Sequence, residues 1–301
     1  MQSKKHIKFY LPDGLRQSAQ AGQHNFLNQV RTVLCAAGFS VEYLKPDNAK
    51  PDPASFSLFH MDEPFLKKSV TIRRAYFYPF WQIERSSQRW QWDIAKAKFN
   101  PDGVEFLKAQ HFYQAWQKRL FSAQLGALSQ DGFVYVPLQG RLSQRRSFQM
   151  CSPLRMIEHV LTQEPIKRVV AALHPKEVYT DLELSGLEKL AVQYKRLELR
   201  MGEMEKLLPC CDYVVTQNSS VAFAGFFFGK RCVTFAKIDF HHITGDVATL
   251  GVDEAFHFVR ERAVDFEKYI WWFLQKMSIN AGRPEAEDKI RLRLQALGLP
   301  V

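Results

Sequence analysis

The stretch that decides the fold is residues 212–237, DYVVTQNSSVAFAGFFFGKRCVTFAK. It opens with an apolar run typical of a buried strand, DYVVTQ, and closes with a second such run, RCVTFAK. Between them, the polar residues Asn218, Ser219 and Ser220 precede VAFAGFFFGK, which we expect to form a short helix. A strand, a helix and a strand in this order predict a βαβ unit of a parallel sheet.

The residues on either side continue this alternation. The predicted elements are strands over 132–139 and 167–175, and helices over 152–163, 264–277 and 285–298. The long segment 185–209 is expected to contain one or two helical segments. Together these elements predict a Rossmann-like C-terminal domain over residues 129–301 that ends in helices.

The first part of the chain has a similar pattern. The predicted elements are strands over 6–11, 40–46 and 55–61, and helices over 26–37 and 104–128. A loop is expected after the turn pair Asp13-Gly14, and another over 45–55. The polar segment SQDG follows residue 128, so we place a domain boundary there and expect a Rossmann-like N-terminal domain over 1–128. The predicted fold class is α/β.

Composition limits the class of protein. The chain has 301 residues, of which 46% are hydrophobic and 24% charged, as is typical of globular proteins. Apolar runs fall short of the roughly 20 residues that a membrane-spanning helix needs, and the N-terminus lacks the apolar stretch of a signal peptide. We therefore expect a cytoplasmic protein. Five cysteines without CxxC spacing predict neither a disulfide framework nor a zinc site.

The formal net charge of +10 favours anionic partners, such as nucleic acid, a phosphorylated sugar or an acidic membrane. The sequence contains no recognised nucleic-acid module, and we expect no nucleic-acid partner. Exposed lysines and arginines could hold the protein peripherally at the anionic inner face of the cytoplasmic membrane. Asp239, His241 and His242 raise the question of a metal site, but adjacent histidines rarely face one ion, so we expect no metal and no cofactor.

Polar residues follow three predicted strands of the C-terminal domain. Gln139 and Arg141 follow the first, His174 the second, and the segment Asn218 to Ser220 the third. Because ligands of parallel sheets bind at the carboxyl ends of the strands, we expect these residues to share one site. Serine hydroxyls at a helix start, an imidazole and a guanidinium all suit a phosphate. A helix cap, a structural histidine and a solvated loop are the alternative interpretations.

The segments VYVPLQ, AALHPKE and YVVTQNSSVAFAGFFFGKRCVTF, followed by FHHI, also carry a family resemblance. Together they resemble the capsule polysaccharide biosynthesis family, which is related to Kdo-transfer enzymes that use a cytidine-monophosphate-activated sugar. The similarity covers roughly residues 133–243. It implies a GT-B fold, in which two Rossmann-like domains face each other across a cleft. It also implies a metal-independent glycosyltransferase with a nucleotide-sugar donor and a glycan or glycolipid acceptor.

The resemblance implies roles for the strand-end residues. His174 and Asn218 to Ser220 would hold the nucleotide and phosphate of the donor, and Gln139 would lie near the donor sugar. The family commonly has an acidic residue in the helix after the serines, whereas this helix begins Val221-Ala222-Phe223. A catalytically inactive nucleotide-sugar- or glycan-binding protein is therefore the alternative function.

An inverting sugar transfer also needs a base near the acceptor hydroxyl. Asp13 and His24 flank the loop after the first predicted strand, and they are the candidates for this role. A turn aspartate and a solvent-exposed histidine are the alternative interpretation. Arg141 is the arginine expected to stabilise the leaving phosphate.

Overall fold

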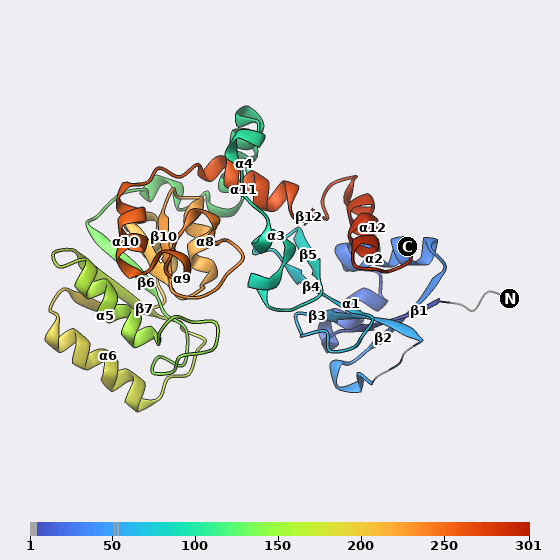
Figure 1. The fold of residues 1–301 in the computed structure, drawn as a ribbon, viewed down its shortest axis with the longest axis horizontal. Coiled ribbons are helices and arrows are strands. Elements are labelled where there is room, and N and C mark those ends of the chain that lie inside the picture. The colour runs from blue at the N-terminus through green and yellow to red at the C-terminus, as the bar shows by residue number, and fades with distance from the viewer. Residues whose placement is uncertain (1–4, 51, 53) are drawn as a thin grey trace. The chain divides into compact units, whose positions relative to one another are not determined.

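The computed structural model describes residues 5–50, 52 and 54–301 (Figure 1). Residues 1–4 of the polar N-terminus, and residues 51 and 53 of the loop expected over 45–55, lie outside the described residues. The chain forms two compact units, one of residues 1–97 with 272–301 and one of residues 98–271. In the described part, each unit is built on one six-stranded, mainly parallel sheet, which confirms the α/β class.

The sheet of the second unit is parallel throughout. Its strands are β6 (Phe133–Pro137), β7 (Arg168–Leu173), β8 (Leu197–Met201), β9 (Tyr213–Thr216), β10 (Arg231–Thr234) and β11 (Gly245–Asp246). They lie in the order β11-β10-β9-β6-β7-β8. The chain runs from β6 outward to β7 and β8, then continues on the other side of β6 with β9. The strand order therefore reverses between β6 and β9, the place where Rossmann sheets bind their ligands.

Helices cover both faces of this sheet. The α-helices of the second unit are α4 (Phe106–Phe121), α5 (Pro153–Gln163), α6 (Asp181–Gln193), α7 (Met204–Cys210), α8 (Ser220–Phe226), α9 (Val247–Leu250), α10 (Val252–Glu261) and α11 (Phe266–Trp271), of which α4 packs on α11 and not on the sheet. The apolar faces of α5, α6 and α10 share one buried core with the strands, while α7 and α8 contact each other and the sheet. Helix α5 follows the predicted spacing, with Met156, Ile157 and Val160 fully buried.

The segment 185–209 contains two helical segments, α6 and α7, as expected, but the strand β8 lies between them. Strand β8 is at the edge of the sheet and pairs with β7 alone. Its residues Glu198 and Arg200 form an ion pair at 3.3 Å and are not buried. An edge strand of this kind has no continuous apolar run, and its charged residues are also compatible with a helix. The sequence therefore did not predict this strand.

The sheet of the first unit is mixed. Its strands are β1 (Lys5–Tyr10), β2 (Phe39–Leu44), β3 (Ser55–His60), β4 (Ser69–Arg74), β5 (Phe80–Glu84) and β12 (Ile279–Asn280). Strands β1 to β4 pair in parallel, and β5 pairs antiparallel with both β4 and β12. The helices are α1 (Asp13–Gln20), α2 (Asn25–Ala36), α3 (Asp93–Lys96), α12 (Ala286–Ala296) and the π-helix Trp272–Lys276. Helix α1 occupies the segment expected to be a loop after Asp13-Gly14.

The two units divide the chain differently from the boundary expected at residue 128. Helix α4 packs on α11, and the Tyr113 hydroxyl donates to the Phe226 carbonyl at 2.9 Å, so this helix belongs to the second unit. At the other end, α12 packs on α2, and β12 pairs with β5. The last 30 residues, 272–301, therefore belong to the first unit. Such a return of the chain depends on contacts between distant segments, which local sequence patterns do not reveal.

Within the described residues, no helix is long and apolar enough to cross a membrane.

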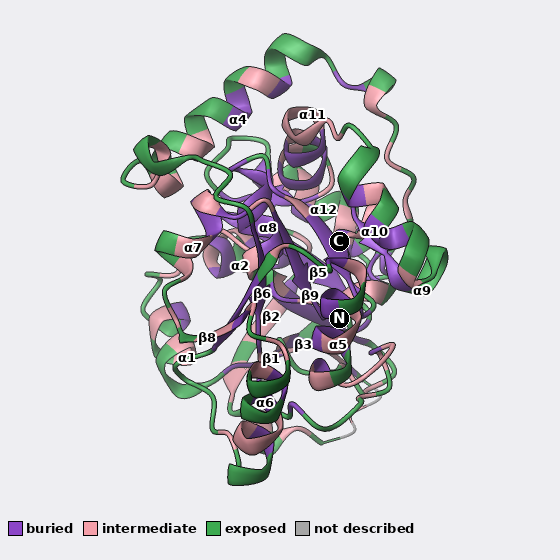
Figure 2. Cartoon of the chain, turned by 90° about the vertical axis from the view of Figure 1, so that its left-hand side faces the viewer, coloured by how far each residue is buried: buried purple, intermediate pink, exposed green. Residues whose placement is uncertain are grey.

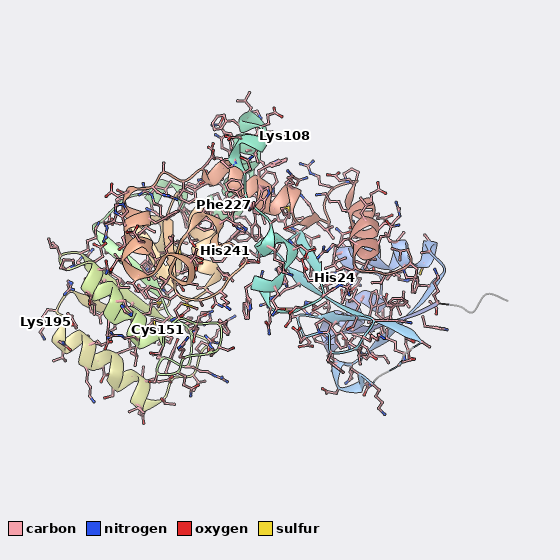
Figure 3. The ribbon with its side chains drawn as sticks, viewed as in Figure 1. His24, Lys108, Cys151, Lys195, Phe227 and His241 are labelled. Atoms are coloured by element: carbon pink, nitrogen blue, oxygen red, sulfur yellow. The ribbon has the colours of Figure 1, made fainter. Side chains whose placement is uncertain are left out.

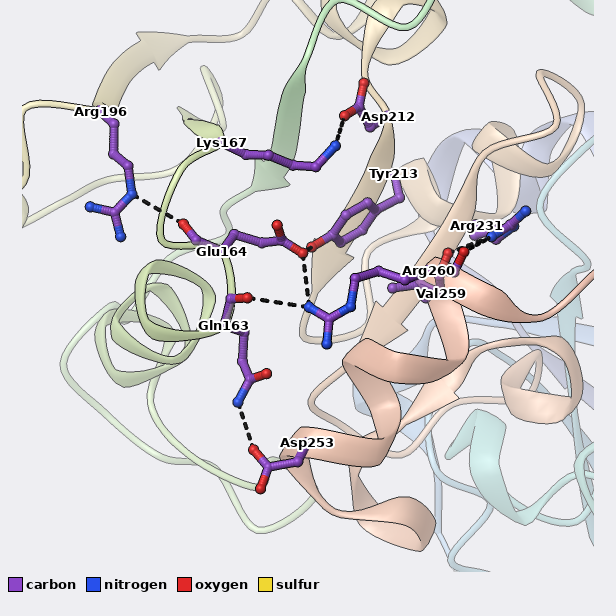
Figure 4. A network of polar contacts seen from close by, with 10 residues as sticks. All are labelled: Gln163, Glu164, Lys167, Arg196, Asp212, Tyr213, Arg231, Asp253, Val259 and Arg260. Atoms are coloured by element: carbon purple, nitrogen blue, oxygen red, sulfur yellow. Dashed lines mark hydrogen bonds and ion pairs between the residues drawn. The ribbon is translucent and has the colours of Figure 1, made fainter.

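A polar network ties the amino-terminal edge of the second sheet together (Figure 4). The Glu164 carboxylate, 6% exposed, accepts from the Tyr213 hydroxyl at 2.7 Å and from Arg260 Nη1 at 3.1 Å. Arg196 Nε donates to the Glu164 carbonyl at 3.1 Å. Burial, reinforced by Glu164, raises the pKa of Tyr213 far above its usual value, so this phenol remains a donor. These contacts join α5, β9 and α10 at the edge opposite to the strand carboxyl ends.

Substitution of Tyr213 tests this network. Tyr213→Phe should lower the free energy of unfolding by about 1–3 kcal/mol, because it leaves a buried carboxylate with one donor fewer. Urea denaturation followed by circular dichroism would measure the change. Tyr194→Phe, at a half-buried tyrosine of the same unit, is the control and should change stability by less than about 0.5 kcal/mol. Equal stability of Tyr213→Phe and the wild type would contradict the structural role of the network.

Candidate functional site

A cavity of about 490 Å³ opens at the carboxyl end of the second sheet. Residues that follow β6, β7, β8 and β9 line it, so it lies at the point where the strand order reverses. Leu138, Ala172 and Val221 are among its apolar lining residues. A cavity of this size suits a nucleotide-sized ligand.

Four of the residues expected from the sequence line this cavity: Gln139, His174, Ser219 and Ser220. Gln139 comes two residues after β6, and His174 directly follows β7. The two serines join β9 to α8. The parallel sheet brings them together because the carboxyl ends of its strands meet at one edge.

Ser219 combines a structural contact with a free donor. It is 6% exposed, and its hydroxyl oxygen caps α8 by accepting from the Val221 N–H at 3.3 Å. Its own N–H donates to the Thr216 hydroxyl at 3.3 Å, which fixes the turn after β9. A cap uses only a lone pair of the hydroxyl, so the hydroxyl hydrogen can still be donated to a ligand. The cap interpretation and the ligand interpretation are therefore compatible.

His174 is held in one orientation by its own turn. Its Nδ1 accepts from the Lys176 N–H at 3.2 Å, so the neutral ring carries its hydrogen on Nε2. Its backbone N–H donates to the Tyr179 hydroxyl at 2.8 Å. The exposed ring therefore offers Nε2–H as a donor to a ligand in the cavity.

The other two expected donor-binding residues, Arg141 and Asn218, are not among the described residues that line the cavity. Arg141 is exposed, and its φ of 63° lies in the left-handed region. Burial, and to a smaller extent the charge of Arg141, lowers the pKa of Arg146 in the same loop after β6. Asn218 is half-buried and directly precedes Ser219.

Three polar residues of the cavity were not expected from the sequence: Glu203, Glu205 and Lys206. They follow β8, the strand that was not expected from the sequence. Gly202 and Glu203 both adopt left-handed backbone conformations, with φ of 69° and 58°, and turn the chain sharply into α7. The glycine after LELRM is the sequence signal that could have marked this strand end. The carboxylates of Glu203 and Glu205 can accept hydrogen bonds from hydroxyl groups of a ligand. The start of α8 has no acidic residue that could do so.

Asp13 and His24, the expected bases, have structural partners in the first unit. Asp13 begins α1 and pairs with Arg16 at 3.0 Å and Lys45 at 3.1 Å; the hydrogen bond from Arg16 is the main cause that lowers its pKa. His24, labelled in Figure 3, caps α2 by accepting from the Leu27 N–H at 3.2 Å. Burial lowers the pKa of His24, which favours the neutral ring.

The adjacent histidines considered for a metal stack on each other. The rings of His241 and His242 lie 4.3 Å apart, centroid to centroid. Nδ1 of His241 lies 3.0 Å from the Ile238 carbonyl, and Nδ1 of His242 lies 2.9 Å from the Tyr269 hydroxyl. Within the ranges that the structure describes, no group of three or more His, Cys, Asp and Glu side chains could hold a metal ion.

Comparison with known proteins gives a structural likeness alone. No family model and no curated protein matches the sequence. Among solved structures, the β-Kdo 2,7 transferase of KpsC from Thermosulfurimonas dismutans aligns over 98% of this chain and 100% of its own. The TM-score is 0.55, and 13% of the residues are identical. This chain shares the fold of that protein. The β-Kdo 2,4 transferase of the same KpsC aligns over 89% of each chain, with a TM-score of 0.48 and 10% identity.

Glu183 of α6 holds the start of its helix. This carboxylate, 7% exposed, forms a capping box with Thr180, accepting from the Thr180 N–H at 3.0 Å. The Thr180 N–H is the main cause that lowers the pKa of Glu183, and the N–H groups of Leu142 and Ser143 add to the effect. This side chain therefore fixes the start of the helix that follows His174 in the chain.

Glu183→Gln should lower stability by about 1 kcal/mol at neutral pH, because the capping box loses its charge. Since the folded-state pKa of Glu183 is lowered, its contribution is present above the unfolded pKa of about 4.3 and is lost as the pH falls through the folded value. The difference between the wild type and the variant should thus shrink in acid. Urea denaturation at several pH values would measure it, with Glu188→Gln on the exposed side of α6 as the control. A difference that does not change with pH would contradict this account.

Proposed function

We propose that this protein is a glycosyltransferase that moves a sugar from a nucleotide-activated donor to a surface polysaccharide or glycolipid acceptor. The main support is the cavity where the strand order reverses, because His174, Ser219 and Ser220 all line it. Nucleotides bind at such reversal points in Rossmann sheets. The fold shared with the T. dismutans Kdo 2,7 transferase favours a donor of the CMP-Kdo type.

The donor phosphate would meet three neutral hydrogen-bond donors in this cavity. These are the hydroxyls of Ser219 and Ser220 and the Nε2–H of His174. Negative charge grows on the phosphate as the sugar leaves, and donors already held in place stabilise that charge in the transition state. Lys206 adds a positive charge to the same lining, and Gln139 would contact the donor sugar.

The carboxylates of Glu203 and Glu205 would accept hydrogen bonds from the ribose hydroxyls. A carboxylate commonly takes this role in Rossmann sheets, and α8 offers none. Asn218 directly precedes Ser219, and Arg141 comes two residues after Gln139, so both would contact the donor at its edge. The transfer as proposed uses no metal and no cofactor.

The first unit would bind the acceptor, as the GT-B arrangement implies, and supply a base. Asp13 is the stronger candidate, because a carboxylate keeps lone pairs beyond those used by Arg16 and Lys45. The lone pair on His24 Nδ1 is already engaged by the Leu27 N–H. We place the reaction in the cytoplasm, at the inner face of the membrane if the acceptor is lipid-linked.

A catalytically inactive nucleotide-sugar- or glycan-binding protein is the second candidate function. The start of α8, Val221-Ala222-Phe223, lacks the acidic residue common in the family that the sequence resembles. The loop after Gln139 likewise lacks the aspartate expected of Kdo-transfer relatives and has Arg141, Ser143 and Arg145 instead. Hydrolysis of the donor in the absence of acceptor would distinguish an enzyme from a binding protein.

Nucleotide binding tests the proposed cavity directly. Cytidine or uridine monophosphate at about 100 times its Kd should stabilise the wild type by about 2.7 kcal/mol and raise its Tm by a few degrees. His174→Ala and Ser220→Ala should each weaken binding by about tenfold or more, because each removes a donor to a charged group. Thermal shift against nucleotide concentration would measure this.

Ser220 is preferred to Ser219 for this experiment, because Ser219 also caps α8. His257→Ala, at an exposed histidine of α10, is the control and should bind as the wild type does. Unchanged affinity in both His174→Ala and Ser220→Ala would refute the proposed site, as would the lack of any nucleotide-induced shift in the wild type.

A further inference from the structure

Helix α4 is fixed to the second unit by one of its faces. Ala109, Phe112 and Tyr113 are buried on that face. The Tyr113 ring stacks on Phe227 at 5.6 Å, and Gln117 Nε2 donates to the Phe227 carbonyl at 2.6 Å. Figure 3 labels Phe227 on this side of the helix and Lys108 on α4 itself. The packed face holds the helix in place and directs the opposite face outward.

The outward face combines basic and apolar side chains. Its exposed residues include Leu107, His111 and Lys118, which recur at helical spacing opposite the buried set. Phe106 is 47% exposed and Leu107 59%. Figure 2 shows much of the length of α4 coloured as exposed. Leu107 therefore places an apolar side chain among the basic residues of the outward face.

Aromatic rings accompany the basic groups of α4. The Arg119 guanidinium lies 4.9 Å from the ring centroid of Trp116, and Lys108 Nζ lies 6.0 Å from that of Trp271. Tryptophan beside lysine or arginine is typical of the boundary between water and lipid, where the ring sits at headgroup level and the cation meets phosphate.

The charge of this segment is of one sign. Residues 106–130 contain Lys108, Lys118 and Arg119 but no aspartate or glutamate, although the chain has 31 acidic residues in 301. Such a surface attracts anions. A nucleic acid would use the basic groups and leave Leu107 in water, whereas an anionic bilayer takes up both kinds of side chain.

We propose that the exposed face of α4 docks on an anionic lipid bilayer. Leu107 enters the boundary between headgroups and acyl chains, and Lys108, Lys118 and Arg119, which lie on the same side of the helix, meet the lipid phosphates. Membrane docking rests on the proposed function in one respect, since a glycolipid acceptor would be presented at this surface. The observations that support it come from α4 and not from the nucleotide cavity.

Vesicle flotation tests the assignment. The wild type should float with vesicles of phosphatidylglycerol and phosphatidylcholine at low salt, and far less with phosphatidylcholine alone. Each basic residue near an anionic surface strengthens binding about fivefold, so Lys118→Gln with Arg119→Gln should weaken it ~25-fold. The matched control is Lys189→Gln with Lys195→Gln. It removes the same charge from two exposed positions, one within α6 and one just after it, and should bind as the wild type does.

A further variant separates the apolar contribution from the charges. Leu107→Ser should reduce the binding that persists at high salt, where the basic groups are screened. A wild type that does not float with anionic vesicles would overturn the assignment, and so would a control pair that loses as much binding as the α4 pair. The nucleotide-induced thermal shift of the α4 pair should equal that of the wild type. Flotation without any such shift in the wild type would support the membrane surface and refute the nucleotide site.

Discussion

The candidate site depends on one constraint, the reversal of strand order between β6 and β9 in an all-parallel sheet. Parallel pairing brings the carboxyl ends of the strands to one edge, and the reversal leaves a crevice where the connections diverge. His174, Ser219 and the turn at Glu203 lie together because their strands end there. The Glu164 network at the opposite edge stabilises the sheet without occupying the site. Stability and ligand binding are thus assigned to opposite ends of the same strands.

The side chains of the site have contacts that orient them and still leave donors for a ligand. Ser219 caps α8 through its oxygen, and His174 accepts a hydrogen bond on Nδ1, so that each keeps a hydrogen to donate. Donors held in this way need little reorganisation when charge develops on a bound phosphate. The acidic residues come from the turn after β8, and not from α8 as in the family that the sequence resembles. Carboxylates can therefore reach the same edge of the sheet either from the turn after β8 or from the helix after β9.

Most of the second sheet could be predicted from sequence, because strands such as β6 and β7 are buried and read as continuous apolar runs. The edge strand β8 was not predicted, because most of its residues are not buried and it has no continuous apolar run. The cavity residues that follow it, Glu203, Glu205 and Lys206, were therefore not predicted either. The boundary between the units was misplaced because α4 and the C-terminal segment pack against elements far away in the chain. Sequence spacing brought together four residues of the cavity, but the conformation of Arg141 depends on a loop whose contacts are not local.

A crystal structure of the protein with cytidine monophosphate would show whether the cavity binds the donor nucleotide. We expect the phosphate within hydrogen-bonding distance of the Ser219 and Ser220 hydroxyls and of His174 Nε2, with the ribose toward Glu203 or Glu205. A nucleotide bound in the same cavity with its phosphate directed away from these three donors would refute the proposed site, as would a nucleotide bound elsewhere on the second unit.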